Sequence, residues 1–93
     1  MRKNAAKAVG LLERAATENI PAALLDLAVS YEMGIGTRKN AKKAYALYLR
    51  GAIWGDEQSY CEVGRCLYYG IGIERDKATA CFWLDRAKAL GKS

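Results

Sequence analysis

Apolar and small residues recur every three to four positions in segments separated by short glycine-containing stretches. Within 21–36, Leu24, Leu27, Ala28 and Tyr31 fall on one face of a helix. This spacing fits the 3.6-residue period of a helix, and no segment shows the two-residue period of a strand. We therefore predict an all-α chain, with this stripe as a buried helix face.

The pattern repeats after 36 residues. KNAAKAVGLLERAA at 3–16 aligns with KNAKKAYALYLRGA at 39–52, with eight of fourteen positions identical, and RDKATACFWLDRAK at 75–88 is a third copy. A period of this length indicates stacked helical units, here five helices. The stripe has a second copy in Tyr60, Val63, Gly64 and Leu67. The predicted units are a half repeat at 3–20, repeat one at 21–56 and repeat two at 57–92, within a single domain at 1–93.

The repeated columns hold residue types that helix geometry favours. Short polar side chains precede the second helix of each unit, where they would accept hydrogen bonds from unpaired amides: Asn4, Asn40 and Asp76. Residues that tolerate a left-handed backbone follow these helices: Asn19, Gly55 and Gly91. One helix face carries small and apolar residues: Ala8, Ala44 and Ala80, then Leu12, Tyr48 and Leu84, then Ala15, Gly51 and Ala87.

Gly-Ile-Gly occurs twice, at 34–36 and at 70–72. A glycine loop of this kind can bind phosphate when it follows a strand and opens a helix. Because no strand is predicted, we interpret both copies as turns that end one helix and lead into the next.

These residues carry a family resemblance. Leu27-Ala28, Tyr31, Gly34-x-Gly36 and Lys43-Ala44 stand in the order and spacing of a known repeat pattern, and much of it returns in repeat two. On this basis the chain resembles the Sel-1-like repeat family of tetratricopeptide-related helical hairpins. The resemblance implies a right-handed α/α solenoid of about two and a half hairpins, whose first helices line a concave groove. It also implies a role as an adaptor that binds other proteins.

The secreted, cysteine-rich branch of that family is expected to differ from this chain. The columns in which that branch has disulfide cysteines hold Ala16, Ala23, Ala52 and Ser59. The three cysteines present are Cys61, Cys66 and Cys81. We interpret them as reduced thiols that act as small, partly buried hydrophobic residues, and we predict a cytoplasmic protein.

Helical phase predicts the groove residues, which lie opposite the buried stripe. They are Leu25, Val29, Glu32 and Met33 in repeat one, and Cys61, Arg65, Tyr68 and Tyr69 in repeat two. Tyrosine and arginine are typical of binding hot spots, and methionine adapts to irregular partners. Two interpretations stay open: the set binds a protein, or its apolar members pack on the turn and on neighbouring helices. With Glu32 as its only acidic neighbour on this face, Arg65 would favour a neutral or acidic peptide.

The formal net charge of +5 predicts a second surface. Stacking should align eight basic residues on the turn side of the solenoid, and we call this set the basic edge: Lys3, Lys7, Arg38, Lys39, Lys42, Lys43, Arg75 and Lys77. It is either a solvated face that the duplication copied, or a contact for an acidic protein, nucleic acid or anionic lipid. Nucleic acid is disfavoured because no aromatic residues are interleaved.

Catalysis and metal binding are not predicted. The chain has no histidine, and no nucleophile–base pair or metal-ligand spacing is apparent. We expect no enzyme activity, no metal and no cofactor. There is also no apolar run of about 18 residues, so no membrane span is expected.

Three functions remain as hypotheses. The first is an interaction module or adaptor that binds a partner protein or peptide in its groove. The second is a small inhibitor or immunity-type protein that neutralises one enzyme or toxin, and the third is a binder of anionic surfaces through the basic edge. Self-association is a further possibility, through an apolar face of the unpaired first helix: Val9, Leu12 and Ala16.

Overall fold

The computed structural model describes residues 2–89, and the side chains of residues 4–89. This part of the chain forms five helices and no strand, which confirms the predicted all-α class. The helices are α1 (Arg2–Ala16), α2 (Pro21–Met33), α3 (Ala41–Ile53), α4 (Glu57–Tyr69) and α5 (Lys77–Ala89).

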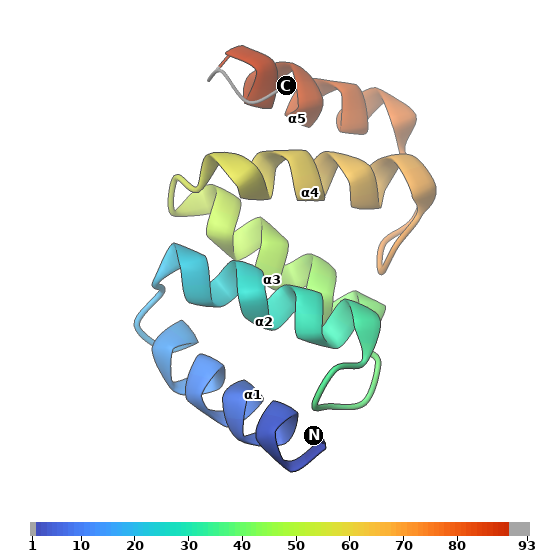
Figure 1. The fold of residues 1–93 in the computed structure, drawn as a ribbon. Coiled ribbons are helices and arrows are strands. Elements are labelled where there is room, and N and C mark those ends of the chain that lie inside the picture. The colour runs from blue at the N-terminus through green and yellow to red at the C-terminus, as the bar shows by residue number, and fades with distance from the viewer. Residues whose placement is uncertain (1, 90–93) are drawn as a thin grey trace.

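The helices form an elongated stack in which each packs on the next one along the chain (Figure 1). α2 and α3 form one hairpin and α4 and α5 another, while α1 packs on α2 and α3 packs on α4. The stack measures 39 × 23 × 19 Å, with α1 and α5 at its opposite ends. This is the predicted solenoid of two hairpins and one additional helix.

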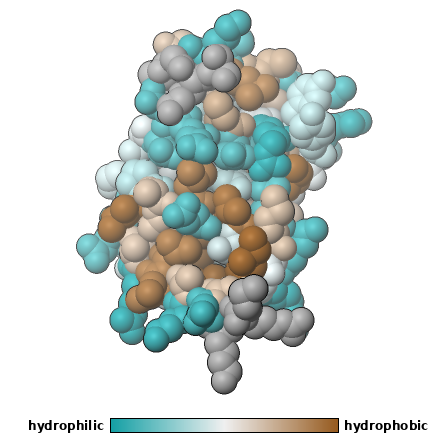
Figure 2. Space-filling view, viewed as in Figure 1, coloured by the Kyte–Doolittle hydropathy of each residue, from teal (hydrophilic) through white to brown (hydrophobic). Residues whose placement is uncertain are grey.

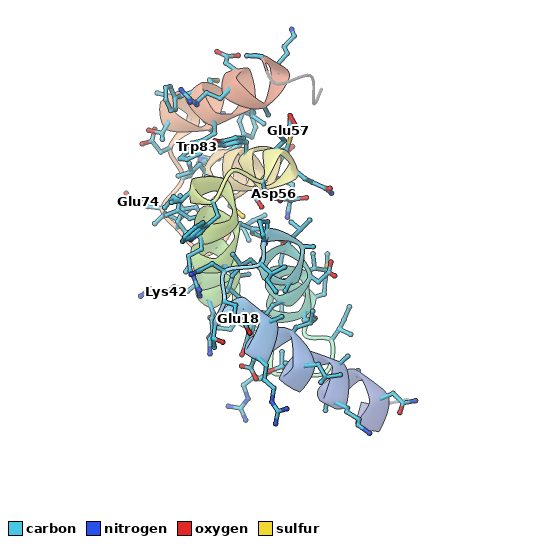
Figure 3. The ribbon with its side chains drawn as sticks, turned by 90° about the vertical axis from the view of Figure 1, so that its left-hand side faces the viewer. Glu18, Lys42, Asp56, Glu57, Glu74 and Trp83 are labelled. Atoms are coloured by element: carbon cyan, nitrogen blue, oxygen red, sulfur yellow. The ribbon has the colours of Figure 1, made fainter. Side chains whose placement is uncertain are left out.

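The core follows the predicted stripe in α2. Its four residues are all buried, and so are most of their second copies in α4: Leu24, Leu27, Ala28, Tyr31, Val63, Gly64 and Leu67. Tyr60 is an exception, because it is only half-buried, with its ring 5.5 Å from that of Trp83 between centroids. Figure 3 shows Trp83 between α4 and α5.

Two of the three predicted N-caps are confirmed. The Asn40 side chain accepts a hydrogen bond from the Lys43 amide at 3.0 Å, and Asp76 accepts one from the Thr79 amide at 3.1 Å. The prediction for Asn4 is wrong, because α1 begins at Arg2 and Asn4 lies within the helix.

A further N-cap, Asp56 of α4, was not predicted. Its carboxylate accepts hydrogen bonds from the amide and the hydroxyl of Ser59. The predicted left-handed residues Asn19 (φ 55°) and Gly55 (φ 89°) are confirmed, and Gly91 lies outside the described residues.

The Gly-Ile-Gly segments are turns, as predicted. The first glycine of each copy ends its helix with φ 72° or 75°. The second has a positive φ as well, and a Cβ there would collide with a backbone carbonyl of the preceding second helix, Ala5 at Gly36 and Ala41 at Gly72. Each turn therefore lies directly on the neighbouring unit, which requires glycine for space as well as for conformation.

The small-residue face behaves differently in α1. Ala44 and Ala80 are completely buried, whereas Ala8, in the same column, is exposed. Leu84, the third copy of Leu12 and Tyr48, is also partly exposed at 38%. The face is therefore buried only where a neighbouring helix covers it.

The apolar face predicted for self-association is already covered. Val9 and Ala16 are buried in the core, and Leu12 packs against it, because this side of α1 contacts α2. Val9 and Ala16 are therefore not available to a second copy, so the prediction that this face is exposed is wrong, while self-association itself stays a prediction.

We predict opposite effects for two glycine-to-alanine substitutions. Gly36→Ala should lower the free energy of unfolding by at least about 2 kcal/mol, because the left-handed backbone and the Ala5 carbonyl both oppose a side chain. Gly10→Ala should raise it by up to about 1 kcal/mol, because Gly10 is inside α1 with nothing within 4 Å of the added methyl. Urea denaturation measures both. Equal effects of the two substitutions would contradict this account of the turn.

Candidate partner-binding surface

The predicted groove residues divide into exposed and buried sets. Val29 and Met33 on α2, and Tyr68 and Tyr69 on α4, expose at least a third of their surface. Met33 and Tyr69 hold matching positions at the ends of their helices and are 61% and 68% exposed. We call these four residues the α2–α4 surface.

Glu32, Leu25 and Cys61 do not belong to this exposed set. Glu32 is buried, Leu25 packs against the core and Cys61 is half-buried. The prediction that Glu32 lines an open groove is therefore wrong. Helical phase places Glu32 at the border between the buried stripe and the exposed face of α2. The side chain turns toward the interior because Tyr48 and Arg65 donate hydrogen bonds to it there.

Glu32 is the centre of a network that links three helices. Arg65 of α4 donates two hydrogen bonds to its carboxylate, from Nη2 to Oε1 at 2.7 Å and from Nη1 to Oε2 at 2.9 Å. Tyr48 of α3 donates from its hydroxyl to Oε1 at 2.8 Å. Paired hydrogen bonds between a guanidinium and a carboxylate are among the strongest polar contacts in proteins. The network therefore fixes α2, α3 and α4 relative to one another.

Arg65 has a second acidic partner. Its Nε donates to Glu62 Oε1 at 2.8 Å, one turn earlier in α4. The expectation that Glu32 is its only acidic neighbour is wrong, because two carboxylates already balance its charge. Arg65 thus links α2 to α4, and because two carboxylates compensate its positive charge it would attract an acidic peptide only weakly.

The pKa shifts agree with this arrangement. The hydrogen bonds from Arg65 lower the pKa of Glu32, although burial opposes that change. Burial, followed by the hydrogen bond to Glu32, raises the pKa of Tyr48. At neutral pH the network consists of an ionised carboxylate, a guanidinium and a protonated phenol, so every contact described here is made.

A pocket of about 350 Å³ opens next to the network, between α4 and α5. It is lined by Arg65, Tyr68, Tyr69 and Leu84. Leu84 stands in the column that Tyr48 occupies in repeat one, and α4 and α5 approach closely there, since a Cβ on Gly64 would lie 2.7 Å from the Leu84 Cγ. In repeat one the Tyr48 ring fills the space beside its first helix. In repeat two the shorter Leu84 side chain leaves the corresponding space open, and this space is the pocket. Sequence analysis did not find Leu84 as a surface residue, although its departure from Tyr48 is visible in the aligned repeats.

Ring contacts hold the aromatic side of the pocket in place. The Tyr68 and Tyr69 rings meet edge to face, with centroids 5.0 Å apart. Lys77 Nζ lies 5.2 Å from the Tyr68 ring centroid.

Figure 2 shows hydrophobic side chains gathered over α1 and α2, with a more hydrophilic band over α4. The apolar character of this side is thus strongest over the first two helices.

The basic edge is less uniform than predicted. Glu74 and Asp76 alternate with Arg75 and Lys77 around a shared hollow. Figure 3 shows Lys42 and Glu74 on the same side of the stack, so acidic groups interrupt the positive charge in repeat two. The side chain of Lys3 lies outside the described residues. The other seven members of the set are exposed: Lys7, Arg38, Lys39, Lys42, Lys43, Arg75 and Lys77.

The three cysteines have different environments. Cys66 is completely buried in the core, and burial raises the pKa of its thiol to about 11. It therefore acts as a small hydrophobic residue, as predicted. Cys61 is half-buried and Cys81 is exposed.

Comparison with known proteins identifies the family. The family model of the Sel1 repeat matches three stretches, residues 1–20, 21–53 and 58–92, which together span most of the chain. The chain belongs to the Sel1 repeat family. No curated protein matches it in a sequence search.

Solved Sel1 repeat structures share the fold. A Sel1 repeat protein from Oxalobacter formigenes is 34% identical with a TM-score of 0.86, over 89% of this chain and 24% of its own. A protective antigen of uropathogenic Escherichia coli strains with an SLR fold is 27% identical with a TM-score of 0.90, over 92% of this chain and 18% of its own. Cysteine-rich protein B of Helicobacter pylori is 24% identical with a TM-score of 0.84, over 89% of this chain and 62% of its own, and it shows the fold alone. This chain spans less than two thirds of each of these proteins.

Sel1 repeats in general mediate protein–protein interactions and are a non-enzymatic type of scaffold. None of the described helices is long and apolar enough to cross a membrane. Among the described residues, no group of three or more His, Cys, Asp or Glu side chains is placed to hold a metal ion. For this Sel1 repeat chain, the lack of enzyme activity and of a cofactor remains a prediction.

Arg65→Ala should destabilise this Sel1 repeat, although sequence analysis placed Arg65 on an open surface. The substitution leaves Glu32 buried without its main partner, and we expect a loss of about 1 to 2 kcal/mol, moderated by the partial exposure of Arg65. Arg38→Ala, at an exposed position, is the control and should change stability by less than about 0.5 kcal/mol. Denaturant titration followed by circular dichroism compares them, and equal stability of the two variants would show that the network contributes nothing.

The network should also make stability depend on pH in the acid range. Because the folded-state pKa of Glu32 is lowered, its contribution is present above the unfolded pKa and is lost as the pH falls through the folded one. We expect the free energy of unfolding to fall as the pH drops below about 5, through the ordinary range of a glutamate carboxyl and into the more acidic range. Glu32→Gln should reduce that loss, with a residual part from Asp76, whose pKa is lowered by the Thr79 amide. An unchanged pH profile in Glu32→Gln would contradict the assignment.

Proposed function

We propose that this Sel1 repeat chain is a protein-interaction module that binds a partner segment on the α2–α4 surface. The observation that carries the proposal is the position of Met33 and Tyr69. Both are more than half exposed, and they occupy the same place in successive repeats. Exposed methionine and tyrosine side chains at repeated positions on adjacent first helices are typical of a surface that binds protein.

The neighbouring network supports this role. The backbone beneath the surface is held by Glu32, Arg65 and Tyr48, so little conformational entropy is lost there when a partner binds. The pocket of about 350 Å³ beside Tyr69 has room for one large apolar side chain. A rigid surface with a single apolar pocket is suited to a short peptide segment with one hydrophobic anchor.

The chemistry of the partner follows from the charges. Because Glu32 and Glu62 balance Arg65, the surface selects for apolar contact rather than for acidic charge. The preferred partner is therefore a peptide that carries an aliphatic or aromatic anchor, and the expected neutral or acidic peptide is narrowed to one chosen by this anchor and not by acidic charge. Adaptor and inhibitor roles both fit such a surface, and the inhibitor role additionally requires that the partner loses an activity on binding.

Affinity capture with paired double variants tests the proposal. Met33→Ser/Tyr69→Ser should weaken binding of a stoichiometrically captured partner at least about tenfold, because the two side chains supply the most exposed apolar contact area of the surface. Ile53→Ser/Trp54→Ser is the matched control, since these residues are similarly exposed at the turn between α3 and α4. Isothermal titration with the purified partner gives the affinities.

Two outcomes would contradict the proposal. Equal binding by both double variants would exclude the α2–α4 surface. Affinity that falls steeply between low and moderate salt would point to the basic edge and an anionic surface instead. Circular dichroism confirms that each variant is folded, which is expected because all four side chains are exposed.

A further inference from the structure

A hollow of about 290 Å³ lies between α1 and α3, which are successive second helices of the stack. Its apolar part consists of three buried residues: Ala16, Leu27 and Leu47. Polar side chains surround this part, two at the end of α1 and two on α3: Glu13, Thr17, Lys43 and Arg50. Lys43, Leu47 and Arg50 follow the i, i+4, i+7 spacing, so all three side chains lie on one side of α3.

The walls of this hollow are complete within the described chain, because α1, α2 and α3 supply all of its residues. The matching side of repeat two lies between α3 and α5. There Ile53 and Arg86, the copies of Thr17 and Arg50, are exposed although a first helix, α2, packs on α3. A first helix does not cover this side of a repeat, so the hollow would stay open beside a helix packed on α1.

The matching position in repeat two carries an aromatic ring. Where repeat one has Leu47, repeat two has Trp83, whose half-buried indole packs against the core. The leucine side chain is shorter, and the hollow lies beside it. The position of Glu13 is apolar in repeat two, where it holds Leu49. Repeat one thus has charged groups around a space, and repeat two has apolar groups around a ring of its own.

The two cations of the hollow are held in place but are not neutralised. Lys43 Nζ lies 4.7 Å from the centroid of the Tyr31 ring. Arg50 Nη2 donates to the Ala16 carbonyl at 3.0 Å and to Asn19 Oδ1 at 2.7 Å. Neither cation forms an ion pair with another described residue. Lys43 Nζ and the Nε and Nη1 groups of Arg50 therefore remain as donors for a ligand carboxylate.

Glu13 gives the hollow a hydrogen-bond acceptor. Its Oε2 accepts a hydrogen bond from the Tyr31 hydroxyl at 2.8 Å. Its Oε1 has no donor within the described part of the chain, so it can accept an N–H group of a ligand. The hollow therefore combines two cations, one acceptor and an apolar surface.

We propose that this hollow binds an aromatic amino-acid residue with a free α-carboxylate. The ring packs on Leu27 and Leu47, at the position where repeat two has an indole, and the neighbouring cations favour an aromatic face. The carboxylate accepts hydrogen bonds from Lys43 and Arg50, and the nitrogen of the residue donates to Glu13. A free aromatic amino acid and the C-terminal residue of a polypeptide share this chemistry.

The site is independent of the proposed function, because it shares no residue with the α2–α4 surface. Met33→Ser/Tyr69→Ser should leave ligand binding in the hollow unchanged. Either proposal can therefore fail without the other.

Nuclear magnetic resonance titration of the whole chain tests the proposal, with the methyl groups of Leu27 and Leu47 as reporters. N-acetyltryptophan should bind saturably and shift these methyl signals. N-acetyltryptophanamide lacks the carboxylate and N-acetylalanine lacks the ring, so each should bind at least about tenfold more weakly. Binding of the amide as tight as that of the acid would overturn the proposal.

A matched pair of charge variants locates the ligand. Lys43→Gln should weaken binding of N-acetyltryptophan at least about threefold, because it removes one of the two cations. Lys42→Gln, next to it on α3 and outside the hollow, is the control and should bind as wild type. Equal binding by the two variants would overturn the proposal.

A third variant fills the hollow. Leu47→Trp supplies the ring that repeat two has at this position, and it should abolish binding. Circular dichroism checks that the variant is folded. Unchanged binding by folded Leu47→Trp would place the ligand elsewhere and overturn the proposal.

Tryptophan itself identifies the source of the ligand. Tighter binding of N-acetyltryptophan than of tryptophan would support the C-terminal residue of a polypeptide. Tighter binding of tryptophan would support the free amino acid, whose ammonium group can pair with Glu13. The absence of a shift at Leu27 with both ligands would overturn the proposal for either source.

Discussion

The carboxylate of Glu32 is the contact on which the arrangement of the repeats depends. Tyr48 approaches it from the same hairpin, and Arg65 approaches it from the next one. A buried carboxylate without partners would be strongly unfavourable, so the ion pair requires that α2, α3 and α4 take one relative position. Small residues permit this position, as at Gly51, where a Cβ would lie 2.5 Å from Ser59 Oγ. The hydrogen bonds select the arrangement, and the glycine allows the helices to reach it.

This network divides the first-helix side into a fixed centre and an exposed apolar border. Arg65 had the properties of a binding residue in the sequence, since arginine is frequent in hot spots. In the folded chain Arg65 donates its hydrogen bonds to Glu32 and Glu62. Most of the exposed apolar area on this side belongs to Met33 and Tyr69 instead. The exposed side chains are therefore apolar and lie beside a fixed network, and this supports the proposal of a partner with a hydrophobic anchor.

Charge alternation gives the stack a second level of organisation. Acidic first helices lie against basic second helices, so the overall charge of the chain arises from three basic helices and not from one basic patch. Glu74 and Asp76 further interrupt the basic edge in repeat two.

Periodicity in the sequence was sufficient to determine the five helices, the Gly-Ile-Gly turns, the caps at Asn40 and Asp76 and most of the core. These features depend on contacts within a few residues, or on a stripe that any packed helix must bury. Only the tertiary structure decided that Glu32 points inward, that Ala8 stays exposed and that Leu84 opens a pocket. The physical reason is that helical phase defines a face but not the neighbour that covers it. Arg65 reaches Glu32 across 33 residues of chain, and no local pattern encodes that distance.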